Sequence, residues 1–385
     1  ISWLISNVFV ACITVMVYMV CALLCNHALG LFGCLLAILS SILLQHSQYA
    51  IVDVPLSFFC TLFLTISIHW IINSNISPKK VLFLSCLTGI ATSMKYTGAL
   101  LILPLFVIIY DFIRKNPIYK GTKHFQLAFT SITSLILFLI TFIVSDNRDY
   151  FLKELVALTT DGIIEIEYHN LFNRAIYFLF FVSLILIVLT YLIRFNKING
   201  LGKLISPFHF QSVFFVFLGF LMLSPFTILE IKSSFADFIY EYRHMQIGSA
   251  AQYHHLSENY QSIIKNMNKI YPLRFYKELM ISNFGISGVS MAIIGAYKLL
   301  IQRKMIGIIV LSFCLLMILT ITSWQNVAIR YTLSFLPIIY ILIPLGMHTL
   351  SSFLDKRYLK YNYSLTILGC ITGFDALIKW ISLFG

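Results

Sequence analysis

The chain has 385 residues, of which 59% are hydrophobic and only 11% are charged, and its mean hydropathy is +0.89. Soluble domains carry about 25% charged residues, so this composition excludes a water-soluble enzyme. The net charge of +12 does not indicate a nucleic-acid partner, because the 27 basic residues fall in short clusters between apolar runs. The apolar runs are continuous rather than alternating, which excludes a membrane β-barrel.

Apolar runs long enough for membrane helices follow one another along the whole chain, at roughly 20 residues per crossing. We expect twelve spans, at approximately 3–24, 30–47, 55–73, 81–94, 98–113, 127–145, 173–193, 209–229, 284–302, 305–323, 331–350 and 363–383. The fourth and fifth are short and closely spaced, which predicts a helical hairpin that turns before it crosses fully. The pattern therefore predicts an all-α polytopic membrane protein of about 12 transmembrane helices, with residues 1–385 as a single domain.

The loops between the predicted spans differ in charge. One set is basic, and the positive-inside rule assigns it to the cytoplasm. The other set includes the two longest loops, 146–172 and 230–283, which hold most of the 15 carboxylates. Long loops on one face of a scaffold are where chemistry usually lies. We therefore expect an extracytoplasmic working face with a large loop at 230–283.

Asp53 lies between two apolar runs near the predicted outer interface, shortly after Tyr49 and two residues before Pro55. As a plain N-cap of the helix 55–73, it would do no more than hold the start of that helix. The functional alternative is a carboxylate that binds or deprotonates a polar substrate at the membrane surface.

Two basic–aromatic pairs, Lys95-Tyr96 and Arg330-Tyr331, fall at the same predicted level. A lysine at the centre of the hydrocarbon costs about 2.5–3.5 kcal/mol, so it either reaches the interface or has an anionic partner. Both cations could be simple interfacial anchors. Two of them on one face favour a site for a lipid phosphate, which a guanidinium binds bidentately.

The predicted outer loop 230–283 holds further polar residues. Candidates for binding an acceptor or a sugar are Glu241, Arg243 and His244. A metal held by His244, His254 and His255 is the alternative, but their spacing matches no metal motif and exposed loop histidines are the better interpretation. No metal site is predicted, and the metal requirement stays open.

Four segments, in this order, resemble glycosyltransferase family 39, the superfamily of protein O-mannosyltransferases. Related enzymes transfer aminoarabinose and lipopolysaccharide-core sugars. The segments are GLFGCLLAILSSILLQHSQYAIVDVPLSFF from Gly30, GIATSMKYTGALLILPL from Gly89, LSPFTILEIKSSFADFIYEYRHMQIG from Leu223 and RYTLSFLPIIYIL from Arg330. The resemblance covers residues 1–350 and includes the sidedness of the loops.

The resemblance implies a GT-C fold and an inverting, mannosyltransferase-like transfer of one sugar from a polyprenyl-phosphate donor. It places transfer on the extracytoplasmic face, which we expect to be the periplasmic side of a bacterial inner membrane. The acceptor would be a glycan, a lipid or a protein. The implied roles are a supporting carboxylate at Asp53, donor-phosphate binding at Lys95, Tyr96, Arg330 and Tyr331, and acceptor or sugar binding at Tyr49, Glu241, Arg243 and His244. No nucleotide cofactor is implied.

One departure from the family concerns its principal catalytic acid, which lies in the first outer loop after the first helix. Ile1 aligns with the start of the second helix. We therefore expect the N-terminal helix and the first outer loop, with that acid, to lie outside this chain. Residues 127–193 also resemble an inserted helix pair.

Two other functions remain open. A polytopic secondary transporter would show inverted repeats and broken helices near the midplane, of which one short hairpin is evident. An O-antigen ligase or polymerase would also use a lipid-linked glycan at the outer face. Its basic outer loops would find a counterpart in Arg243 and the histidine pair 254–255.

Overall fold

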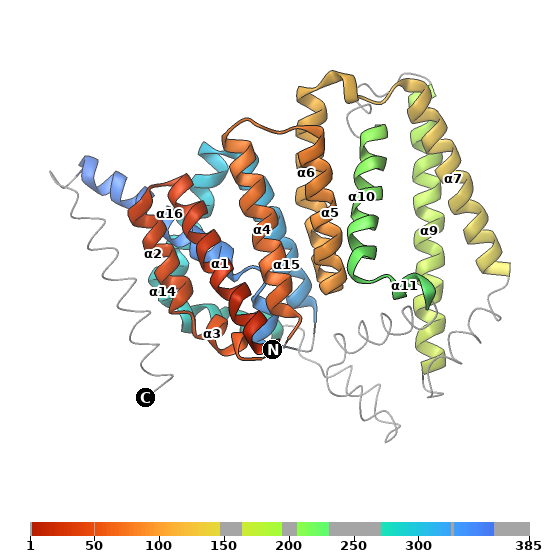
Figure 1. Ribbon diagram of the computed structural model, residues 1–385. Coiled ribbons are helices and arrows are strands. Elements are labelled where there is room, and N and C mark those ends of the chain that lie inside the picture. The colour runs from red at the N-terminus through yellow and green to blue at the C-terminus, as the bar shows by residue number, and fades with distance from the viewer. Residues whose placement is uncertain are drawn as a thin grey trace. The chain divides into compact units, whose positions relative to one another are not determined.

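The computed structural model describes residues 2–49, 51–146, 164–194, 206–230, 271–324 and 327–357 (Figure 1). These residues form helices joined by turns, and no strand occurs among them. Seven helices are long and apolar enough to cross a membrane, or eight if one bent pair counts as a single span. The prediction of an all-α polytopic membrane protein is confirmed. The predicted span 363–383 lies outside the described residues.

The chain divides into two compact units, and the first contains residues 1–108, 214–224 and 267–385. Its helices are α1 (Ser2–Leu24), α2 (His27–Ile38), α3 (Ser41–Ser47), α4 (Asp53–Ile72), α5 (Pro78–Met94), the 3-10 helix η1 (Tyr96–Leu101), α14 (Tyr271–Gln302), α15 (Lys304–Ser323), the 3-10 helix η5 (Ile329–Thr332) and α16 (Leu336–Arg357). Within it α1 packs against α2 and α4, and α14 packs against α15 and α16 (Figure 1).

Glycines let the helices of this unit approach closely. A side chain at Gly295 would meet the backbone of Leu342, and one at Gly346 would meet the backbone of Met291, where α14 crosses α16. Close backbone approach through small residues is typical of membrane helices, which gain their packing energy from van der Waals contact rather than from the hydrophobic effect.

Two helices of the unit are broken. The bend between α2 and α3 is 55° and begins a new helix that Ser40 caps, because its hydroxyl accepts from the amide of Leu43. In α14, Gly285 has φ 68° and ψ 171°, a conformation that an L side chain rarely adopts. The helical segment before this kink begins at Tyr271 rather than near 284, so the end of the predicted outer loop 230–283 is helical.

The predicted hairpin around Lys95 is present, but its second arm is longer than expected. The 3-10 helix η1 continues directly into α6 (Ile102–Lys115), and together they run for 20 residues from Tyr96. Gly98 makes the turn possible, because a Cβ there would meet the carbonyl of Ala91. The second arm is therefore long enough to cross a membrane.

The second unit contains residues 109–213 and 225–266, and its described elements are the end of α6, η2 (Pro117–Tyr119), α7 (Lys123–Asp146), α9 (Ile164–Arg194), the start of α10 (Pro207–Leu223) and α11 (Phe226–Leu229). Hydroxyl groups join α7 to α9. The Ser134 and Ser183 hydroxyls each donate to the other's carbonyl, at 3.3 and 3.2 Å. The predicted helix pair within 127–193 is thus present.

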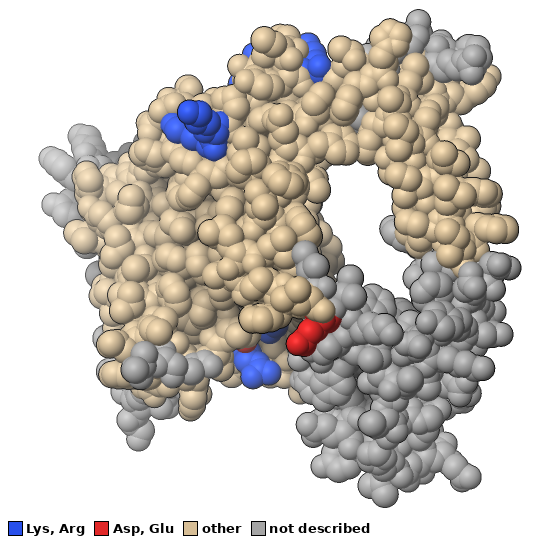
Figure 2. Space-filling model, turned by 45° about the vertical axis from the view of Figure 1, so that its right-hand side comes forward, with Lys and Arg blue, Asp and Glu red and all other residues tan. Residues whose placement is uncertain are grey.

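The surface carries its charge at the ends of the helices. On the left-hand part of the face in Figure 2, basic side chains lie near the top and the bottom, and the described surface between them is uncharged. An uncharged belt between two charged rims is the distribution that a bilayer selects.

Candidate functional site

The carboxylate of Asp53 lies in the first turn of α4, with its side chain only 6% exposed. The N-cap of α4 is Val52, and no side chain caps this helix end. The simple N-cap interpretation of Asp53 is therefore wrong. The free amides and the dipole at the start of the helix still favour a negative charge here.

Lys95 is the partner of this carboxylate. It ends α5 in an extended conformation, and its Nζ donates to Asp53 Oδ1 at 2.8 Å. Its side chain is 13% exposed, so it turns inward to an acid rather than reaching for the interface. The anchor interpretation of Lys95 is wrong. Carboxylate and ammonium lie at helix ends of complementary polarity, the first turn of α4 and the last turn of α5.

Arg330 supplies a second cation from η5. Its Nε lies 4.0 Å from Asp53 Oδ2, and its side chain is 46% exposed. Both cations also face one aromatic ring, since Lys95 Nζ lies 4.8 Å and Arg330 Cζ 5.4 Å from the centre of the Tyr331 ring. Such cation–π contacts hold a positive charge at low dielectric without neutralising it.

Trp324 completes an aromatic wall behind the cations. Its ring lies 5.3 Å from Tyr331 and 6.3 Å from Tyr96, edge to face in both pairs. The structure thus brings together Asp53 and both predicted basic–aromatic pairs, from three separate stretches of the chain.

Two hydrogen bonds to backbone carbonyls hold the η5 segment in place, one from α4 and one from α14. Ser57 donates to the carbonyl of Leu333 at 2.7 Å, and Tyr276 of α14 donates to the carbonyl of Ala328 at 3.4 Å. Sequence reasoning missed both anchoring residues. Ser57 lies one helical turn after Asp53, so the i, i+4 rule could have found it. Tyr276 stands in the sequence among the tyrosines of the predicted outer loop, which suggest sugar stacking rather than an anchor for η5.

Other predicted site residues do not join this cluster. Tyr49 is exposed, its carbonyl accepts from the Ser6 hydroxyl, and its side chain makes no hydrogen bond or ring contact within the described part of the chain. Five further candidates lie outside the described residues: Glu241, Arg243, His244, His254 and His255. Among the residues that the structure describes, no group of three potential metal ligands is present.

Among the described residues, the cluster combines one carboxylate with two cations. Asp53 Oδ1 is occupied by Lys95, whereas the guanidinium of Arg330 is half-exposed and more distant from the carboxylate. Asp53 thus contacts both cations, and the Arg330 side chain also faces outward from the cluster. These features define a multi-pass membrane protein that gathers a buried carboxylate and two cations at one end of its helices.

Comparison with known proteins adds little to that class. The chain matches no protein-family model and none of the curated proteins. Among solved structures it is similar to the archaeal oligosaccharyltransferase AglB from Archaeoglobus fulgidus, in complex with an inhibitory peptide and a dolichol-phosphate. The likeness has a TM-score of 0.45 and 12% sequence identity, and covers 98% of this chain but only 44% of that one. A TM-score below 0.5 does not define a common fold, so the chain's own residues have to carry the functional argument.

Proposed function

We propose that the chain belongs to a membrane glycosyltransferase of GT-C type, which transfers a sugar from a polyprenyl-phosphate donor to an acceptor at the extracytoplasmic face. The observation that carries the proposal is the cluster of Asp53, Lys95 and Arg330 at the ends of α4, α5 and η5. The Arg330 side chain is half-exposed and its Nε lies 4.0 Å from Asp53 Oδ2, which supports a role in binding an anionic ligand beside the carboxylate.

The donor phosphate is the proposed ligand of the two cations. A polyprenyl phosphate has its charge at the membrane interface and its tail in the hydrocarbon, next to the helices that hold the site. As the glycosidic bond breaks, the electron pair stays with the phosphate oxygen and its negative charge grows. Cations fixed in a water-poor site stabilise this developing charge, and an Arg fork matches the phosphate oxygens.

Asp53 is proposed as the supporting carboxylate. The acceptor hydroxyl must pass its proton to a base as it attacks the anomeric carbon. Since Asp53 Oδ1 already accepts from Lys95, its role is to position that cation. The proton acceptor is then a separate carboxylate, as the resemblance to glycosyltransferase family 39 implies. Inversion at the anomeric carbon and acceptor binding by Tyr49, Glu241, Arg243 and His244 belong to the same proposal.

The second candidate is a secondary transporter, which one observation favours. The breaks in α2–α3 and α14 meet, because the Ser41 hydroxyl lies 3.3 Å from the Asn283 side-chain oxygen. Broken helices often form transporter sites. Here the polar groups already bind one another, since Tyr340 of α16 also donates to Ser40 at 2.5 Å. A satisfied network of this kind is a structural joint rather than a substrate site.

The test is binding and turnover of the lipid donor by purified protein in proteoliposomes. We expect Arg330→Gln to bind undecaprenyl phosphate about tenfold more weakly, since a hydrogen bond to a charged group is lost. Arg274→Gln is the matched control, because Arg274 is an exposed cation paired with Glu278 on its own helix. Release of free polyprenyl phosphate from a polyprenyl-phosphate mannose donor then measures transfer. Equal affinity in Arg330→Gln and Arg274→Gln would exclude the proposed donor site.

A further inference from the structure

A cavity of about 370 Å³ lies at the opposite end of α4 from the Asp53 cluster. It is lined by Tyr18, Met19, Val20, Ala22, Leu23, His27, Thr65 and His69. Asp53 and His69 are 16 residues apart on one helix, which is about 24 Å along its axis. The cavity and the cluster are therefore at different membrane faces, and a ligand of the cavity is independent of the proposed function.

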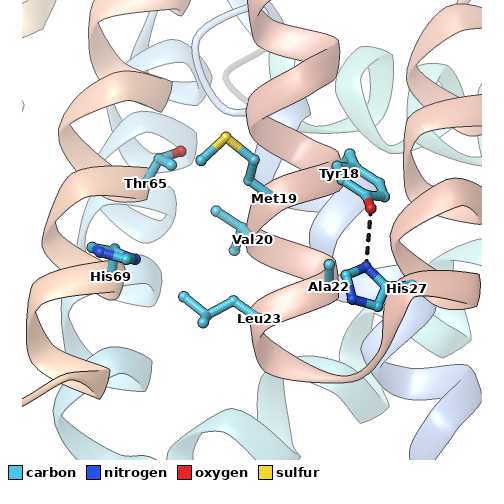
Figure 3. Close-up of a pocket in the computed structure, with 8 residues that line it drawn as sticks. All are labelled: Tyr18, Met19, Val20, Ala22, Leu23, His27, Thr65 and His69. Atoms are coloured by element: carbon cyan, nitrogen blue, oxygen red, sulfur yellow. Dashed lines mark hydrogen bonds between the residues drawn. The ribbon is translucent and has the colours of Figure 1, made fainter.

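The walls of the cavity are apolar. Figure 3 shows Met19, Val20 and Leu23 extending from α1 toward α4, where Thr65 and His69 face them. Tyr18 and His27 lie on the other flank of α1 and bind each other, with 3.0 Å between the phenol oxygen and Nδ1. The residues that α4 contributes to the cavity, Thr65 and His69, face the space between α4 and α1.

Thr65 places an unpartnered hydroxyl in this space. The residue is 7% exposed, and its Oγ1 has no hydrogen-bond partner among the described residues. Figure 3 shows this oxygen pointing toward Met19, whose side chain lines the cavity. Helical threonines usually donate to the carbonyl four residues earlier, as Thr61 does to Ser57 at 2.7 Å. A buried polar group without a partner is costly, which indicates that a ligand completes it.

The chain that follows the mouth of the cavity is basic. His69 lies one turn beyond Thr65 on the same face of α4 and is exposed. The segment from His69 to Lys80 contains two lysines and no acid. Within this segment, Lys80 Nζ donates to the carbonyl of Asn75 at 2.9 Å and lies 5.1 Å from the centre of the Trp70 ring.

We propose that this cavity binds an anionic glycerophospholipid of the adjacent leaflet. Its phosphate would lie at His69, where the basic segment 69–80 begins. Its ester carbonyl would displace the flexible Met19 side chain and accept from Thr65, one helical turn or about 5.4 Å deeper. One acyl chain would cover Met19, Val20 and Leu23. This order of phosphate, ester and chain is that of the lipid itself, read from the interface inward.

The test measures lipid binding to delipidated protein in detergent by native mass spectrometry, with dioleoylphosphatidylglycerol as the probe. We expect Thr65→Val, which keeps the shape and removes the hydroxyl, to weaken binding about fivefold. Thr65→Ser should restore it. Thr61→Val is the matched control and should bind as the wild type does. Without lipid, Thr65→Val should melt no lower than the wild type, since it removes an unsatisfied group.

Two further probes identify the ligand. Dioleoylglycerol lacks the phosphate and glycerol 3-phosphate lacks the chains, so both should bind at least about tenfold more weakly than the complete lipid. His69→Phe should reduce the preference for phosphatidylglycerol over dioleoylglycerol. If dioleoylglycerol bound as tightly as phosphatidylglycerol, the cavity would be an apolar groove without a phosphate site. If glycerol 3-phosphate bound as tightly, the ligand would be a soluble phosphate ester rather than a lipid. Either result overturns the proposal, as does unchanged lipid affinity in Thr65→Val.

Discussion

Two buried carboxylates of this protein each have two cations, yet they are built differently. Asp111 pairs with Arg114 at 2.6 Å and Lys115 at 2.7 Å, all on α6. These cations are 56% and 60% exposed and three and four residues away. Asp53 takes Lys95 from 42 residues away and Arg330 from the far end of the chain. The first cluster needs only a helix, whereas the second needs the assembled fold.

This difference separates an anchor from a site. The cations of Asp111 reach water from the end of a membrane helix, where basic residues fix topology. The Lys95 side chain is only 13% exposed, and its ammonium lies 2.8 Å from the Asp53 carboxylate. The ion pair therefore has to offset the cost of removing the ammonium from water. Substitutions in the two clusters can test whether anchor and site are as distinct as their contacts indicate.

The largest effect is expected from Lys95→Met. It removes the hydrogen-bonded cation of the buried Asp53 carboxylate and leaves only the more distant Arg330, so it should lower the free energy of unfolding by about 3–5 kcal/mol. Arg114→Gln and Lys115→Gln remove exposed cations and should each cost less than about 1 kcal/mol. Denaturant titration of the detergent-solubilised protein measures all three. Similar losses in the two clusters would show that the distinction is wrong.

The double variant Asp53→Leu/Lys95→Met should regain most of that stability, because an apolar pair of similar volume can replace a buried ion pair at little cost. It should still bind undecaprenyl phosphate about tenfold more weakly than the wild type, since an ammonium near the phosphate is gone. Lipid binding and denaturant titration of the same preparation check both effects. A stable double variant with normal donor affinity would make the pair purely structural.

Arg330→Gln should separate binding from stability in one substitution. The guanidinium is half-exposed and 4.0 Å from the carboxylate, so its removal should change the free energy of unfolding by about 0.5 kcal/mol or less. Donor KM should rise about tenfold while acceptor KM stays constant. Steady-state kinetics with varied donor and acceptor check this, and an unchanged donor KM would return Arg330 to the role of an anchor.

The smallest effect on donor binding and transfer is expected from Asp111→Asn. Its cations can turn to water once the carboxylate is neutral, so stability should fall by less than about 1 kcal/mol. Donor affinity and transfer should equal those of the wild type in the same assays. A loss of transfer comparable to that of Arg330→Gln would mean that the Asp111 cluster also serves the reaction.

Most helix positions could be predicted from the sequence. A continuous apolar run in lipid has to satisfy its own backbone hydrogen bonds, and an α-helix does so within one segment. Errors occurred where the tertiary structure sets the end of a helix. The helix predicted at 284–302 begins at Tyr271, since Gly285 kinks it rather than starting it. The helix predicted at 331–350 begins at Leu336, and Arg330 and Tyr331 belong to a 3-10 turn before it.

The candidate site was predicted in part. Asp53, Lys95 and Arg330 stood out because charge in apolar sequence is costly and demands a reason. Their pairing did not follow, since each had a plausible local role as a cap or an anchor. Tyr276 and the unpartnered hydroxyl of Thr65 carried no signal for these roles, because both residue types are common in membrane helices.

Residue types and their order along the chain are enough to establish a helical membrane protein and to show which charged residues need partners, because the cost of exposing polar groups to lipid is local. The identity of those partners depends on the packing of the helices. Lys95 meets Asp53 because the turn at Gly98 and the packing of α4 on α5 bring two helix ends together. Thr65 meets no partner among the described residues because α1 leaves a cavity beside it. Such meetings depend on contacts between distant segments, which residue type and spacing along the chain do not encode.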